Sequence, residues 1–126
     1  MGYVIGCLVA ALSFLLNRML IKQIGLKTVI TTGPVIEEGT KTLLAFFLGA
    51  DIFAAHVTFG VVEACYDWYK NGRTGMKAAL FSIGGHSLFG AVTILLLSIS
   101  GSIWLALAAG IMAHIIWNVT VIRIYA

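Results

Sequence analysis

The chain has 126 residues, of which 60% are hydrophobic and only 10% are charged. A mean hydropathy of +1.03 is too apolar for a soluble domain of this length, because a small domain leaves much of its surface in water. The formal net charge is only +3, and no basic patch is interleaved with aromatic residues, so nucleic acid is not expected as a partner. The composition therefore indicates an integral membrane protein.

Five apolar segments are predicted to be transmembrane helices, since a bilayer core about 30 Å thick needs roughly 20 residues per helix. They cover residues 3–20, 29–50, 52–69, 76–98 and 102–124. The breaks between them are short, and no repeat or long linker is present. The sequence predicts an all-α bundle of about five transmembrane helices that forms one domain over residues 1–126.

The start of the second segment can be read in two ways. Gly33-Pro34 could kink a helix that has already begun at Val29, or Pro34 could begin the helix, with residues 31–33 as its entry. In the second case residues 27–33 would lie along the membrane interface.

The basic residues predict the orientation of the chain. Seven of the eight flank the first loop, the third loop or the C-terminus: Arg18, Lys22, Lys27, Lys70, Arg73, Lys77 and Arg123. Because cytoplasmic loops carry the excess of lysine and arginine, the N-terminus is expected outside and the C-terminus in the cytoplasm. The expected location is the plasma membrane.

Two adjacent glutamates, Glu37 and Glu38, lie in the second apolar segment, with Lys41 one turn later. A charged side chain at the bilayer centre costs roughly 2.5–3.5 kcal/mol on insertion scales. Two carboxylates placed there therefore indicate a chemical function. Adjacent residues lie about 100° apart around a helix, and the two glutamates are therefore expected to do different jobs.

Titratable groups on four segments lie at a similar predicted depth. Glu37, Glu63, His86 and His114 are each seven to ten residues from the nearest cytoplasmic basic residue, which is roughly 10–15 Å at the helical rise per residue. Asn118 lies four residues after His114 and shares its helix face. The shared depth predicts that these groups form one site.

Small residues near the two histidines predict close helix packing. Gly84, Gly85 and Gly90 surround His86, and Gly110 precedes His114 by one turn. His56, by contrast, is expected to be a hydrogen-bonding group between helices.

These residue types suit hydrolysis of an amide or ester within the bilayer. A carboxylate beside an imidazole can orient and deprotonate a water molecule. A second histidine with an amide four residues later can donate hydrogen bonds to a developing oxyanion.

The order of these motifs resembles the PrsW-like intramembrane proteases. The motifs are Glu37-Glu38-x-x-Lys41, Phe59-x-x-x-Glu63, His86 and His114-x-x-Trp117-Asn118, and the resemblance covers about residues 35–118. That family is related to the CAAX-prenyl proteases and bacteriocin-processing enzymes, and more distantly to the scaffold subunit of gamma-secretase. In the prenyl-protease relatives the first motif ends in an arginine one residue later than Lys41.

The resemblance implies a glutamate-dependent intramembrane protease that needs no metal or other cofactor. It implies that Glu37 activates water together with His86, and that Glu38 is fixed by an ion pair with Lys41.

The resemblance also implies that His114 and Asn118 form the oxyanion site. Glu63 matches the glutamate of the third span in the family, where it would share a proton with Glu37 or position His86. The expected substrate is a membrane protein or a prenylated or otherwise lipidated peptide. The chain is shorter than its relatives, so a homo-oligomer or a partner subunit is an open alternative.

Three other functions remain open from the residues alone. Two histidines and two or three glutamates could bind zinc or a di-metal centre, although no His-Glu-x-x-His pair is present. Buried glutamate, histidine and lysine chains also carry protons in transporters. A non-catalytic membrane scaffold could use the same residues to bind a partner helix.

Overall fold

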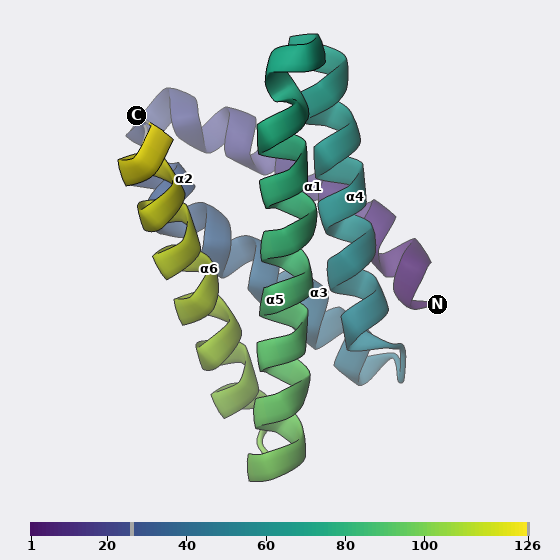
Figure 1. The fold of residues 1–126 in the computed structure, drawn as a ribbon. Helices are drawn as coiled ribbons and strands as arrows, with labels where there is room; N and C mark the ends of the chain where they lie inside the picture. The colour runs from purple at the N-terminus through teal and green to yellow at the C-terminus, as the bar shows by residue number, and fades with distance from the viewer. Residues whose placement is uncertain (26, 126) are drawn as a thin grey trace.

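A computed structural model describes residues 1–25 and 27–125 (Figure 1). Within these residues the chain forms helices and short links, with no β-strand, so the predicted all-α fold is confirmed. The elements are α1 (Gly2–Ile24), α2 (Lys27–Ile30), α3 (Thr32–Phe47), α4 (Ile52–Asn71), the 3-10 helix η1 (Gly72–Gly75), α5 (Met76–Ser100) and α6 (Ile103–Tyr125).

Three helical stretches are long and apolar enough to cross a membrane: Gly2–Ile24, Ile52–Ser100 and Ile103–Tyr125. The second stretch contains α4 and α5, which η1 joins into a hairpin (Figure 1). Large apolar side chains are exposed on α1, α5 and α6, among them Leu8 at 66% and Ile99 at 72%. The chain is therefore a membrane protein whose outer surface suits lipid.

The second predicted span is not one continuous helix. α2 ends at Ile30, and α3 begins at Thr32 with Pro34 in its first turn, where a residue without an N–H group is tolerated. The structure thus corrects the predicted range 29–50: α3 begins at Thr32, two residues before the later predicted start at Pro34, and ends at Phe47. The 16 residues of α3 rise only about 24 Å, which is less than the thickness of a bilayer core.

The helices form two layers (Figure 1). α4, α5 and α6 run side by side, and α1 and α3 cross behind them. The C-terminal part of α6 lies near α2, and the two helices are in contact (Figure 1). The apolar core joins α1, α3, α4 and the start of α6 through Ile5, Val9, Ala10, Ala45, Ile52, Ala55, Phe59 and Ile103.

Glycines bring α4 and α5 close together. A Cβ on Gly60 would lie 2.9 Å from the Cβ of His86, and one on Gly90 would lie 2.8 Å from the Cβ of His56. The prediction of close packing at Gly90 is therefore confirmed. A Cβ on Gly84 would meet no neighbouring atom within 4 Å, so the prediction was wrong for this glycine, which faces away from the other helices.

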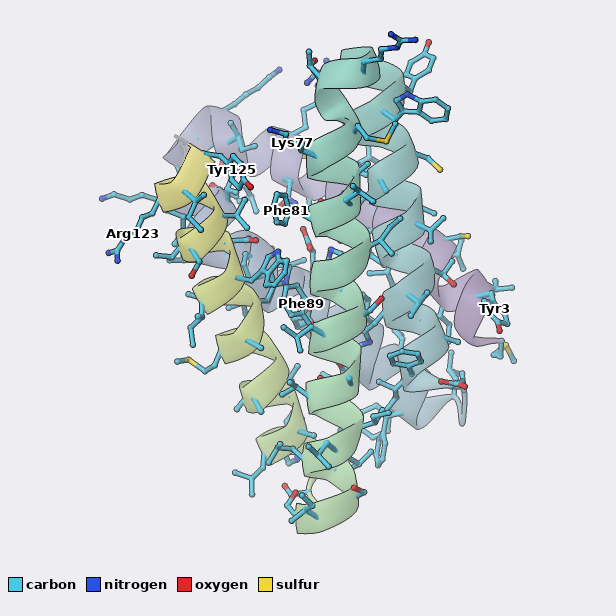
Figure 2. All side chains as sticks on the ribbon, viewed as in Figure 1. Tyr3, Lys77, Phe81, Phe89, Arg123 and Tyr125 are labelled. Atoms are coloured by element: carbon cyan, nitrogen blue, oxygen red, sulfur yellow. The ribbon has the colours of Figure 1, made fainter. Side chains whose placement is uncertain are left out.

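One end of the bundle is rich in basic residues and is called the basic end here. Lys77 at the start of α5 and Arg123 near the end of α6 lie toward this end (Figure 2). The Lys77 ammonium lies 5.9 Å from the ring centre of Tyr125, which joins the two helices there.

Candidate active site

A cavity of about 310 Å³ lies among the helices and is lined by residues of α1, α2, α3, α4, α5 and α6. Five of the predicted site residues line it: Glu37, Glu63, His86, His114 and Asn118. The structure therefore brings together groups that are up to 81 residues apart in the sequence, counted from Glu37 to Asn118. Glu38 and Lys41 do not line the cavity, and both are fully buried behind its wall.

The carboxylate of Glu38 is surrounded by nitrogen atoms. Its Oε1 lies 2.8 Å from Nζ of Lys41 and 2.9 Å from Nδ1 of His114, and its Oε2 lies 2.7 Å from Nε2 of His56. An ionised carboxylate can only accept hydrogen bonds, so Nδ1 of His114 carries a proton and donates it. The pair of Lys41 and Glu38 offsets the cost of burying either charge alone.

The ammonium of Lys41 also contacts His86. Its Nζ lies 2.9 Å from Nδ1 of His86, and an ammonium has only donors, so Nδ1 accepts this bond. The proton of the neutral imidazole is then on Nε2, which donates to Oε2 of Glu63 at 3.0 Å. The hydroxyl of Ser82 donates to the same glutamate oxygen. Both ring nitrogens of His86 are therefore occupied.

The Nε2 atoms of the two cavity histidines therefore differ, since one is a hydrogen-bond donor and the other is an acceptor. His86 presents an N–H that is bonded to Glu63, whereas His114 has a lone pair on Nε2. Oε2 of Glu37 lies 4.0 Å from Nε2 of His114, and Oε1 of Glu37 accepts from Nδ2 of Asn17 at 2.8 Å. A gap of 4.0 Å is too long for a direct hydrogen bond and leaves room for a water beside both atoms.

Aromatic rings hold the histidines in place. The ring of Phe89 stacks on His114, with a centroid distance of 4.4 Å and an angle of 19°. The ring of Phe59 lies 4.6 Å from that of His86 and 4.2 Å from the ammonium of Lys41. Phe81 and Phe89 lie between α5 and α6 (Figure 2). Both histidine rings are thus fixed by packing as well as by hydrogen bonds.

Asn118 connects two helices. Its Nδ2 donates to the backbone oxygen of Val29 at 2.9 Å and so joins α6 to α2. The side chain also lines the cavity, which leaves its second N–H as a donor beside His114.

Sequence reasoning did not place His56 or Asn17 in the site. His56 does bond between helices, as expected, but its partner is the buried carboxylate of Glu38. The spacing of seven residues between His56 and Glu63 puts both on one face of α4, and this signal could have found it. Asn17 lies near the end of a predicted span and carries no sequence signal for its contact with Glu37.

A group of three side chains with metal-ligand chemistry lies on the same wall. Ligand atoms of Glu37, His86 and His114 are within 4.8 Å of one another, and two histidines with one carboxylate are a known zinc set. His86 fits this role poorly, because its Nδ1 accepts from Lys41 and its Nε2 keeps the proton given to Glu63. A metal there would require one of these bonds to break.

Comparisons with protein families, with curated proteins and with solved structures gave no match to this chain. The resemblance to the PrsW-like proteases therefore stays a prediction, and the function has to be inferred from the site.

Proposed function

We propose that this protein is an intramembrane peptidase of the PrsW-like and CAAX-protease type. It hydrolyses a peptide bond in a membrane-embedded or membrane-anchored protein. The observation that carries the proposal is the pair formed by Oε2 of Glu37 and Nε2 of His114, 4.0 Å apart on the cavity wall. Neither atom has a hydrogen-bond partner in the described part of the chain, and both side chains are more than nine-tenths buried.

A water beside this pair can donate one hydrogen to Glu37 and the other to His114. Its lone pairs are then free to attack the carbonyl carbon of the scissile bond. Glu37 takes a proton from the water as the C–O bond forms, and this proton passes to the leaving nitrogen as the C–N bond breaks. The contact between Glu38 and the Nδ1–H group of His114 keeps the lone pair on Nε2, so His114 accepts the second hydrogen bond from the water.

The other histidine has a different role in this proposal. The resemblance assigns His86 to the water and His114 to the oxyanion, but the hydrogen bonds favour the reverse. His86 carries its proton on Nε2, and a developing oxyanion that displaces the Glu63 carboxylate would accept from this N–H without rotation of the ring. The second N–H of Asn118 is a further donor on the same wall.

The proposed topology has five crossings, with the N-terminus outside, the C-terminus in the cytoplasm and the plasma membrane as the location. The basic residues at one end of the bundle support this orientation. A Cβ on Gly2 would lie 2.5 Å from the backbone oxygen of Asp51, so the N-terminus and the start of α4 are on the same side. α3 and the following residues 48–51 together would make the second crossing.

Cleavage of defined peptides tests the proposal. The purified protein in detergent is incubated with a panel of membrane-spanning and prenylated peptides, and the products are identified by mass spectrometry. Wild type should cleave a subset of the panel, and Glu37→Gln should not. Gln keeps the shape of the side chain and an oxygen that can accept from Asn17. Loss of cleavage would therefore result from loss of the carboxylate's role in catalysis. Equal cleavage by Glu37→Gln and wild type would show that the proposed water activation is wrong.

A zinc-dependent hydrolase is the second candidate, and it rests on the cluster of Glu37, His86 and His114. In that case the metal would lower the pKa of a bound water and supply the nucleophile. Metal analysis of the purified protein separates the two candidates.

A further inference from the structure

The cavity is acidic in a protein that is basic overall. Glu37, Glu63 and Asp67 line it, and none of the eight lysine and arginine residues does. The basic residues of α4, α5 and α6 lie near the same end of the bundle, yet they stay outside the cavity. A cationic group entering from the basic end would therefore meet a wall of carboxylates.

Asp67 is the outermost of these carboxylates. It lies four residues after Glu63 on the same face of α4, one turn closer to the basic end. No cation of the described residues lies within ion-pair distance of Asp67. Lys70, three residues later, places its ammonium 5.8 Å over the ring of Tyr66, and Lys77 is beside Tyr125. The carboxylate of Asp67 is therefore available to a cation from outside the protein.

The inner end of the cavity independently points to a ligand. The side chains of Glu37 and His114 are only 8% and 6% exposed, and each keeps one atom without a hydrogen-bond partner among the described residues. Both residues line the cavity, so these atoms can bond to a molecule that enters it. The rim nearer the basic end is apolar and exposed at Ile21, Val29 and Ile122.

We infer that the site selects substrates with a lysine or arginine about two residues to the cytoplasmic side of the scissile bond. This inference rests on the proposed function and names its substrate class. Glu63 is bonded to the N–H of His86, which is the proposed donor to the scissile carbonyl. Asp67 lies one helical turn beyond Glu63, about 6 Å away, and an extended peptide covers that distance in about two residues at about 3.3 Å each. Membrane spans carry lysine and arginine at their cytoplasmic border, so a membrane substrate offers this cation beside its apolar segment.

The cleavage test compares single-span peptides that differ only at that position, with lysine in one and glutamine in the other. Wild type should cleave the lysine peptide with about two- to fivefold higher kcat/KM, which corresponds to the contribution of one partly exposed ion pair. Asp67→Asn should reduce this ratio to about one, whereas Lys70→Gln, which removes a positive charge near Asp67, should keep or raise it. Asp67→Lys should favour a glutamate peptide instead. A ratio that Asp67→Asn leaves unchanged overturns the inference.

A binding test separates this inference from the proposed function. Glu37→Gln protein is titrated with fluorescent peptides whose single lysine is moved one residue at a time along the cytoplasmic border. The peptide with its lysine at one particular position should bind more tightly than a lysine-free peptide. Adding Asp67→Asn to the Glu37→Gln protein should abolish that preference. If wild type cleaves nothing, the proposed peptidase is wrong, and this titration still decides the role of Asp67. Equal binding of all peptides overturns it.

Discussion

The ammonium of Lys41 donates a hydrogen bond to Nδ1 of His86 at 2.9 Å, 45 residues away in the sequence. The same ammonium donates to Glu38, which in turn accepts from His114. One buried lysine therefore helps to fix the proton positions on both cavity histidines. His86 is left with a donor and His114 with an acceptor, and this difference assigns their roles.

The histidine tautomers can be observed directly. We expect His86 to carry its proton on Nε2 and His114 to carry it on Nδ1, because of their contacts with Lys41 and Glu38. Nitrogen-15 NMR of the ring nitrogens in detergent micelles distinguishes the two forms. The same tautomer on both rings would contradict the hydrogen-bond network described above.

Replacement of Glu37 should remove activity and leave the fold intact. Glu37→Gln takes away the group that accepts a proton from water, and loss of such a group costs about 10²–10⁴-fold in kcat. The amide oxygen can still accept from Asn17, so stability should be close to that of wild type. Peptide cleavage and unfolding in SDS are measured on the same sample. A variant that loses both peptide cleavage and stability would indicate a structural role for Glu37.

Replacement of Lys41 should act on stability. Lys41→Met leaves the carboxylate of Glu38 buried without its closest cation, and breaking a buried pair costs about 3–5 kcal/mol. The double variant Glu38→Gln with Lys41→Met should recover part of that loss, because no uncompensated charge remains. SDS unfolding of the four proteins in a double-mutant cycle gives the coupling. Additive effects would mean that the pair does not act as a unit.

Two glycines offer a matched pair for testing helix packing. A Cβ on Gly110 would lie 2.5 Å from Oγ1 of the buried Thr93, so Gly110→Ala should push α6 from α5 and cost about 1–3 kcal/mol. Gly84→Ala meets nothing within 4 Å and should stabilise the protein by about 0.4–1 kcal/mol. SDS unfolding of both variants checks these signs. Equal stabilities would argue against the close contact at Gly110.

Removal of metal should leave the activity unchanged. His86 cannot bind a metal through Nε2 while it keeps the proton given to Glu63, and its Nδ1 accepts from Lys41. Elemental analysis should find no stoichiometric zinc, and dialysis against a chelator should not change the cleavage rate. Loss of activity on dialysis, restored by zinc alone, would favour the metal-dependent candidate.

Most of the helical architecture could be predicted from the sequence. The structure places α4 at Ile52–Asn71 and α5 at Met76–Ser100, close to the predicted 52–69 and 76–98. Hydropathy and helix length are local properties, so they can be predicted for each segment without knowing which other helices it packs against. The second segment was the exception, since Pro34 permits a kink or a helix start and the local sequence does not choose between them.

The sequence by itself determined that Glu37 and Glu38 point in different directions, because adjacent residues on a helix are separated by about 100°. Only the tertiary structure decided which of them lines the cavity, since that depends on how α3 is rotated against α1 and α6. It also decided which nitrogen of His114 stays free, because the donors and acceptors that fix a tautomer come from other helices.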